Sequence, residues 1–218
     1  MTTAELGPLS ITLPLSEAPP GIRSMKHPTA TPSEPIMRFF TPELYTRFNS
    51  SDDSVADHAN EAWENALQEY RRHLDAIRDQ MPSQVRTVAD LNLHDAELLG
   101  FEQDVQSAFP FPEPSSATPR WSAVAILSLR QDAVMRSLIY VLWDRVREHP
   151  AEDDWPFSKS RKHWLYDELD VVPGRPGLFR HRVLFSDGGV TEIPFVSVIT
   201  SNVTLPAAED GAGARRTA

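Results

Sequence analysis

The sequence predicts an α+β protein in which N-terminal helices pack on an antiparallel β-sheet, a meander of about five or six strands. Two different periods of the apolar residues lead to this prediction. Before residue 82, apolar residues recur every three or four positions, as on one face of a helix. After residue 93 they recur every two positions, as in strands with one buried face. Residues 37–205 are therefore expected to form one domain, with 37–82 helical and 93–200 rich in strands.

The uneven distribution of the 19 prolines sets the expected limits of that domain. Residues 1–36 hold many of them and few bulky apolar side chains, so this segment cannot offset its ordering entropy and is predicted to be a disordered leader. The composition changes sharply at Met37, and one hypothesis is that Met37 is the natural start. Residues 206–218 are rich in Ala and Gly and are predicted to form a flexible tail.

Two helices are predicted before residue 82. Thr41-Pro42-Glu43 is a helix start, because threonine caps, proline fits the first helical position and glutamate meets the positive end of the helix dipole. The first helix is expected to run to about Phe48. A longer helix is expected from about Val55 to Met81-Pro82, and residues 83–92 are predicted to form a short helix or turn. The apolar stripe of the long helix comprises Ala59, Ala62, Trp63, Ala66, Leu67, Tyr70, Leu74 and Ile77.

Six segments with alternating apolar residues are predicted to be strands. They are Leu98–Gln103, Trp121–Arg130, Val134–Val146, His163–Val172, Leu178–Ser186 and Val190–Ile199. The third segment also fits a helical period, but its alternation favours a strand. Pro194 lies inside the last segment, which predicts an edge strand or a bulge there, because proline cannot donate to a ladder.

The turn Pro173–Gly177 predicts the register of the hairpin around it. With Val172 opposite Leu178, Glu168 faces Arg182, and a second opposite-charge pair, Asp170 and Arg180, shares the same face. Further along, Leu165 would face Phe185. A slip of one residue would scatter both the charged and the apolar pattern, so the register is strongly specified.

The other face of this hairpin is apolar except for Asp167 and His181, which become diagonal neighbours. A three-residue turn at Asp187–Gly189 would then place Phe195 opposite His181. A buried carboxylate requires a hydrogen-bond donor, and His181 is the nearest candidate. Two interpretations remain open: a structural pair that fixes the sheet, or a histidine oriented by an aspartate at the floor of a pocket.

A second polar pair, His94 and Asp95, precedes the first strand segment. One hypothesis joins it to the first pair in a composite site of His94, Asp95, Asp167 and His181 that binds a divalent cation, since nitrogen and oxygen ligands suit zinc or manganese. The alternative is that Asp95 caps a turn and His94 bonds to neighbouring backbone. No other cofactor is predicted, because phosphate-binding loops, nucleophile elbows and dinucleotide-binding fingerprints are absent from the sequence.

Composition narrows the classes of partner. The chain has 31 acidic and 21 basic residues, a formal charge of −10, and such a field repels nucleic acids and anionic membranes while favouring a basic protein surface. The absence of cysteine excludes disulfides and thiolate chemistry. The sequence has neither an apolar run long enough to span a bilayer nor a signal peptide, so a cytoplasmic location is predicted. Composition leaves the oligomeric state open.

Four short strings carry a family resemblance. They are Phe40-Thr41-Pro42-Glu43-Leu44, Arg47-Phe48-Asn49-Ser50, Leu93-His94-Asp95-Ala96, and the segment from His181 through Phe185-Ser186-Asp187-Gly188. Together, over about residues 37–200, they resemble uncharacterised bacterial proteins with a helical N-terminal part and a β-rich C-terminal part entered through Leu-His-Asp. Similar β-domains occur among proteins that look like immunity partners of bacterial toxins. The resemblance implies no catalytic residues.

Two functions follow as hypotheses. The first is a non-catalytic protein-interaction module of immunity type, motivated by the acidic charge, the resemblance and the lack of a catalytic signature. The alternative is a metal-dependent hydrolase that uses His94, Asp95, Asp167 and His181.

Overall fold

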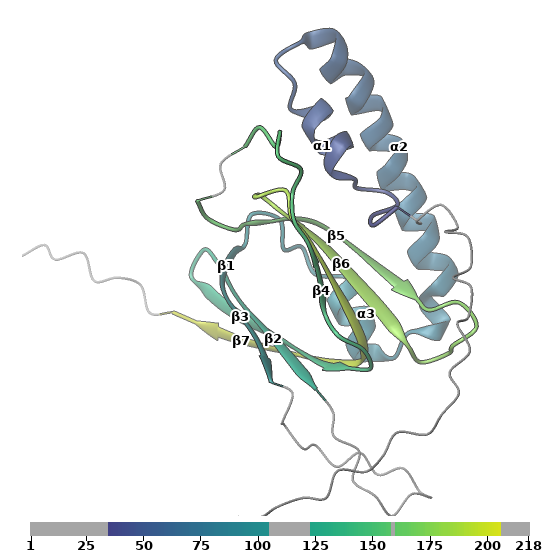
Figure 1. The fold of residues 1–218 in the computed structure, drawn as a ribbon. Helices are drawn as coiled ribbons and strands as arrows, with labels where there is room; N and C mark the ends of the chain where they lie inside the picture. Colours follow the sequence, from purple (N-terminus) through teal and green to yellow (C-terminus); the bar gives the residue numbers. More distant parts are fainter. Residues whose placement is uncertain (1–34, 105–122, 158–159, 206–218) are drawn as a thin grey trace, which may run out of the picture. The chain divides into compact units, whose positions relative to one another are not determined.

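The N-terminal helices lie against a curled antiparallel sheet in the computed structural model of the chain, which confirms the α+β class (Figure 1). The structure describes residues 35–104, 123–157 and 160–205, which belong to one compact unit beginning at Pro35. Most of the predicted leader, a proline-rich segment at residues 109–114 and the predicted tail lie outside the described residues.

The elements follow the predicted order. The helical ones are α1 (Pro42–Phe48), α2 (Asp53–Ile77), the short 3-10 helix η1 (Arg78–Gln80) and α3 (Ser83–Ala89). The strands are β1 (Glu97–Asp104), β2 (Val124–Gln131), β3 (Val134–Leu142), β4 (Arg147–His149), β5 (Trp164–Val171), β6 (Phe179–Phe185) and β7 (Val190–Thr204). The segment from residue 134 is thus a strand, and β7 continues five residues beyond its predicted end at Ile199. The sequence prediction missed β4, which is only three residues long.

Side-chain caps fix where α1 and α2 begin. The Thr41 hydroxyl accepts a hydrogen bond from the Leu44 N–H at 3.2 Å, and the Asp52 carboxylate accepts from the N–H groups of Ser54 and Val55. Within the predicted stripe of α2, Ala62 is exposed rather than buried. None of the helices in the described ranges has the length and apolar character needed to cross a membrane.

The sheet has the strand order β1-β2-β3-β7-β6-β5, with β4 pairing with β7 beyond the end of β3. Consecutive strands pair within each half, and the halves join through β3 and β7 rather than through strands adjacent in sequence. An isolated bridge between Glu97 and His163 then brings β1 to the start of β5, where the Trp164 N–H donates to the Ala96 carbonyl at 2.8 Å. The sheet therefore curls until its first and last strands meet (Figure 1).

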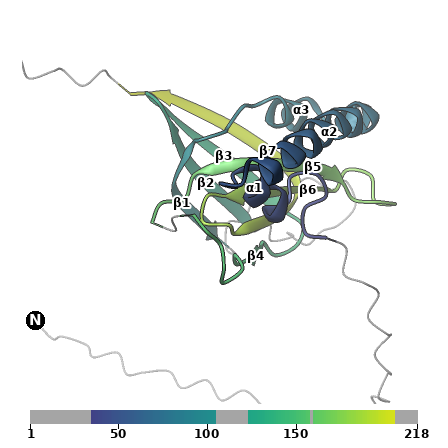
Figure 2. The ribbon, with the colours of Figure 1, turned by 90° about the horizontal axis from the view of Figure 1, so that it is seen from above.

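Two apolar clusters pack on opposite faces of β5 and β6. The inner cluster fills the curl of the sheet and includes Tyr140, Trp164, Phe179 and Phe195. The outer cluster joins the sheet to the helices and includes Met37, Phe40, Trp63, Leu165 and Leu184. Figure 2 shows α2 alongside β5, where the two elements are in contact.

The predicted β5–β6 register is confirmed from Asp167 to Val171, where Glu168 faces Arg182 and Leu169 faces His181. The prediction is wrong at the start of β5, because a register shift between Trp164 and Tyr166 brings Trp164 opposite Phe185 in place of Leu165. This irregularity lets Trp164 join the inner cluster while Leu165 joins the outer one.

The predicted β6–β7 register is wrong by two residues, since His181 faces Ile193 and not Phe195. The cause lies at Ser186. Its hydroxyl donates to the Arg161 carbonyl and accepts from the His163 N–H, and its own N–H donates to the His163 carbonyl. Ser186 therefore leaves the ladder with β7, and the three-residue turn is Ser186–Gly188 instead of the predicted Asp187–Gly189, since the Phe185 N–H donates to the Gly189 carbonyl at 2.9 Å. A shift of two residues preserves which face each side chain occupies.

Pro194 lies in the interior of β7, beside an irregularity in the ladder. The register of β3 and β7 shifts between Val141 and Leu142, which pair with Ser197 and Phe195. The Pro194 carbonyl accepts from the Trp143 N–H at 3.3 Å, in the gap between β3 and β4. The predicted bulge is thus confirmed, and it occurs where proline's missing N–H breaks no regular ladder.

Candidate functional site

Asp167 and His181 form the predicted pair on the inner face of the sheet. Nε2 of His181 lies 2.9 Å from Oδ2 of Asp167, and Nδ1 lies 2.8 Å from the Tyr140 hydroxyl oxygen. Oδ1 of Asp167 accepts from the Trp164 indole N–H at 2.9 Å. A neutral imidazole with its proton on Nε2 satisfies every contact, since it donates to Asp167 and accepts from the Tyr140 O–H.

Burial decides between the two interpretations of this network. The side chain of His181 is 0% exposed, and Tyr140 and Trp164 are also 0% exposed. Only Asp167 reaches solvent, with 21% of its side chain exposed. Burial, followed by the negative charge of Asp167, raises the pKa of Tyr140 well above 10, so the phenol stays neutral. Because no substrate can touch the imidazole, the geometry supports a structural pair.

The second predicted pair lies on the surface. Nδ1 of His94 is 3.0 Å from a carboxylate oxygen of Asp95, and the two side chains are 42% and 75% exposed. Asp95 has a φ of 66°, the left-handed conformation of a turn, and its N–H donates to the Trp164 carbonyl at 2.8 Å. The His94 ring packs against Tyr166, with ring centroids 5.1 Å apart.

The structure does not bring the two pairs together. Tyr166, which contacts His94, packs against the outer cluster, whereas the network of Asp167 and His181 lies among inner-cluster side chains. The pairs therefore occupy opposite faces of β5. In the residues that the structure describes, no three His, Asp or Glu side chains lie close enough together to hold a metal ion. The composite four-residue site is thus not assembled.

Glu168 has partners that the sequence did not indicate. Its carboxylate is buried, with Oε1 accepting from the N–H groups of Phe39 at 2.6 Å and Phe40 at 2.8 Å, and Oε2 accepting from the Arg38 N–H at 2.9 Å. The Nε of Arg182, which faces Glu168 across the hairpin, donates instead to Glu192 at 3.1 Å. Glu168 thereby attaches the segment before α1 to the sheet. Local sequence patterns do not predict contacts between residues about 130 positions apart.

The other predicted charge pair also has different contacts. Oδ1 of Asp170 lies 3.3 Å from Nε2 of His73 on α2, although Arg180 is its cross-strand neighbour. The Nε of Arg180 is buried without a hydrogen-bond partner. At these positions the predicted register is correct, but the segment before α1 and the helix α2 supply the partners of the two acidic side chains.

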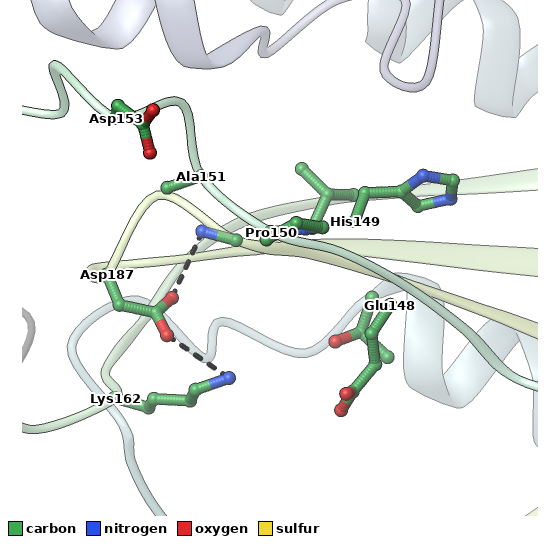
Figure 3. A pocket seen from close by; sticks show the side chains of 10 residues that line it. Glu148, His149, Pro150, Ala151, Asp153, Lys162 and Asp187 are labelled. Carbon is green, nitrogen blue, oxygen red and sulfur yellow. Dashed lines mark hydrogen bonds and ion pairs between the residues drawn. The ribbon is translucent and has the colours of Figure 1, made fainter.

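An open pocket of about 600 Å³ lies where β4 and the loop after it meet the β6–β7 turn (Figure 3). Nζ of Lys162 is 3.1 Å from Oδ2 of Asp187, and Oδ1 of Asp187 accepts from the Gly189 N–H at 3.1 Å. The His149 imidazole points away from this ion pair (Figure 3). The described lining residues therefore stabilise a turn and offer no histidine and carboxylate at hydrogen-bonding distance.

A stripe of carboxylates follows the exposed face of α2. Asp53, Asp57, Glu61 and Glu64 are all exposed, and their spacings of four, four and three residues place them on one side of the helix. They span about 16 Å at the helical rise. Among the described residues, none of the four makes an ion pair with a basic side chain. We call these four residues the acidic stripe.

Comparison of the chain with protein-family models, curated proteins and solved structures finds no match. Function therefore has to be inferred from the arrangement of the side chains described above.

Proposed function

We propose that the protein is a non-catalytic protein-binding module whose partner presents a basic surface. The acidic stripe on α2 is the observation that carries this proposal. The resemblance to immunity partners of bacterial toxins supplies the most specific form of the proposal, in which the partner is a basic toxin.

The acidic stripe reduces the stability of the isolated protein. Asp53 with Asp57, Asp57 with Glu61, and Glu61 with Glu64 are like-charge neighbours one helical turn apart. Each such pair destabilises a helix by about 0.2–0.5 kcal/mol, so the three together cost roughly 1 kcal/mol. Lysine or arginine side chains of a partner would relieve this repulsion, and the negative field would accelerate their approach.

The proposed absence of catalysis is supported by the position of the titratable groups. His181 is inaccessible, and both of its ring nitrogens have partners inside the protein. His94 and Asp95 are exposed, but they lie on the opposite face of β5. A general base has to reach the proton that it removes from a bound substrate, and the exposed pair of His94 and Asp95 does not line the described pocket.

Charge removal at the acidic stripe tests the proposal. Tagged full-length protein and the variant Asp57→Asn, Glu61→Gln, Glu64→Gln would be used to capture proteins from cells of the native source. The matched control, Glu69→Gln, Asp75→Asn, Asp79→Asn, removes three exposed carboxylates from the other end of the helical segment. We expect a basic protein to be retained by the wild type and the control and lost by the stripe variant, with retention falling as salt rises.

Two results would contradict the proposal. One is equal retention of every captured protein by the stripe variant. The other is recovery of no protein partner together with measurable hydrolysis of a substrate panel. Elemental analysis separates the alternative metal-dependent hydrolase: we expect sub-stoichiometric zinc, manganese and iron, whereas one tightly held metal per chain would favour that alternative.

A further inference from the structure

β7 lies between β3 and β6 and extends beyond the end of its pairing with β6. It pairs with β6 only from Val190 to Phe195, but with β3 as far as Thr204. Within the described ranges, no strand pairs with the second edge of residues 196–204. Figure 2 shows this end of β7, in yellow, leading away from the helices. α3 packs against β7, but within the described residues no strand pairs with this side of residues 196–204, which is therefore an unpaired strand edge.

The exposed side chains at this edge are apolar. Val203 and Ile199 are 59% and 58% exposed, which makes them the most exposed large hydrophobic side chains in the described part of the chain. They are four residues apart and so lie on the same face of β7. Residues 196–204, Val-Ser-Val-Ile-Thr-Ser-Asn-Val-Thr, contain no charged residue and no proline. Open edges usually carry such residues as protection against pairing, and this segment lacks them.

We propose that a second copy of the chain pairs with this edge, antiparallel, through residues 199–203. A twofold axis would pass beside Ser201, so that Ser201 faces the partner's Ser201 and Ile199 faces the partner's Val203. Thr200 would face the partner's Asn202. The same patch then serves both copies, as an isologous dimer requires.

The sequence of the edge specifies this register. A slip of one residue would place Ile199 and Val203 opposite side chains of the other face, and a slip of two would place one of them opposite Ser201. In the proposed register, the outer-face row Ile126, Ile139 and Ile199 continues into Val203 and Met135 of the partner subunit. Apolar cross-strand neighbours of this kind stabilise a sheet.

Charge favours a second copy at this edge rather than elsewhere on the surface. Each chain carries a formal charge of −10, so two copies repel one another wherever carboxylates meet. The uncharged segment 196–204 permits contact without burying an unpaired carboxylate. The acidic stripe lies on α2 and is not part of the proposed pairing segment.

The natural absence of cysteine makes a direct crosslinking test available. Ser201→Cys places two thiols opposite one another at the axis, whereas Ser128→Cys, on the same face of β2 and two strands away from the edge, serves as the matched control. With mild oxidant, we expect a disulfide-linked dimer from S201C and none from S128C. Equal crosslinking of the two variants would overturn the proposal.

Sedimentation of the full chain supplies the second test. We expect the wild type to sediment as a dimer at micromolar concentrations, and Ser201→Asp and Ser201→Lys each to sediment as monomers, because like charges then face one another. Mixing these two variants should restore the dimer as a heterodimer. A monomeric wild type, or a dimer that persists in Ser201→Asp, would overturn the proposal; in the first case the edge would be open to an extended segment of another protein.

Discussion

Nε2 of His181 lies 2.9 Å from Oδ2 of Asp167, and through this contact a chain of hydrogen bonds runs from the Trp164 indole to the Tyr140 hydroxyl. The chain crosses the inner cluster from β5 through β6 to β3, strands that are not all neighbours in the sheet. Since every polar group in it has a partner, the network stabilises the curl of the sheet and not a reactive centre.

The buried tyrosines predict the response of stability to alkaline pH. Burial and then the charge of Asp167 raise the pKa values of both Tyr140 and Tyr70 well above 10. Above about pH 10 the unfolded chain loses these phenolic protons while the folded protein keeps them, so the free energy of unfolding falls as pH rises. The slope is about 1.4 kcal/mol per pH unit for each tyrosine. Urea unfolding followed by tryptophan fluorescence on both sides of pH 10 would measure it.

Tyr140→Phe separates this effect from general alkaline destabilisation. The substitution removes the O–H donor to His181, so we expect a loss of about 1–2 kcal/mol at neutral pH. It also removes one titrating group, so the alkaline slope should decrease by about 1.4 kcal/mol per pH unit. An unchanged slope in Tyr140→Phe would show that its phenol titrates normally.

From the contacts of Glu168 we predict that the segment before α1 opens locally when this carboxylate is removed. In Glu168→Ala, the N–H groups of Arg38, Phe39 and Phe40 lose their acceptor, and we expect a loss of about 3–5 kcal/mol with faster hydrogen exchange at these amides. Glu168→Gln is the control, because its remaining carbonyl oxygen can still accept from Phe39 and Phe40. Hydrogen exchange equally fast in both variants would mean that the side chain's volume, and not its acceptors, holds the segment.

The sequence predicted the β5–β6 register correctly from Asp167 to Val171 because two independent patterns specify it there. The opposite charges of Glu168 and Arg182 indicated one face, and the apolar residues around His181 indicated the other. The β6–β7 register depends on Ser186, whose partners lie in the segment before β5, so no pattern within the hairpin could reveal it.

The candidate site shows the same division between local and distant information. Asp167 and His181 could be paired from strand periodicity alone. Their separation from His94 could not, because it depends on how the sheet curls to bring β1 beside β5. The partners of Glu168 could not be predicted either, because they belong to the segment before α1, whose position on the sheet does not follow from strand periodicity.

The β6–β7 turn predicts a large effect of one methyl group. Gly188 has a φ of 81°, and a Cβ there would lie within 2.8 Å of the Ala151 Cβ and overlap the Trp155 ring. Gly188→Ala therefore combines backbone strain with displacement of a buried tryptophan, and we expect a loss of about 3 kcal/mol or more. Gly174→Ala is the control, because its φ of 69° is also left-handed but nothing lies within 4 Å of its Cβ.

Thermal unfolding of the two glycine variants would measure the difference. Gly174→Ala should lose only the cost of strain, about 1 kcal/mol. Equal losses in the two variants would mean that the Trp155 loop moves aside without cost.

The acidic stripe predicts opposite effects on stability and binding. Glu61→Lys replaces two repulsions, with Asp57 and Glu64, by two attractions at helical spacing, so we expect the free energy of unfolding to rise by about 1–2 kcal/mol. Glu61→Gln removes the repulsions alone and should give about half of that gain. Retention of the basic partner should be highest for the wild type, lower for Glu61→Gln and lowest for Glu61→Lys, because each substitution makes the binding surface less negative. Urea unfolding and the capture assay, applied to the same preparations, would measure both effects; a Glu61→Lys protein that is more stable and still retains every partner would show that the stripe is a solvated surface with no binding role.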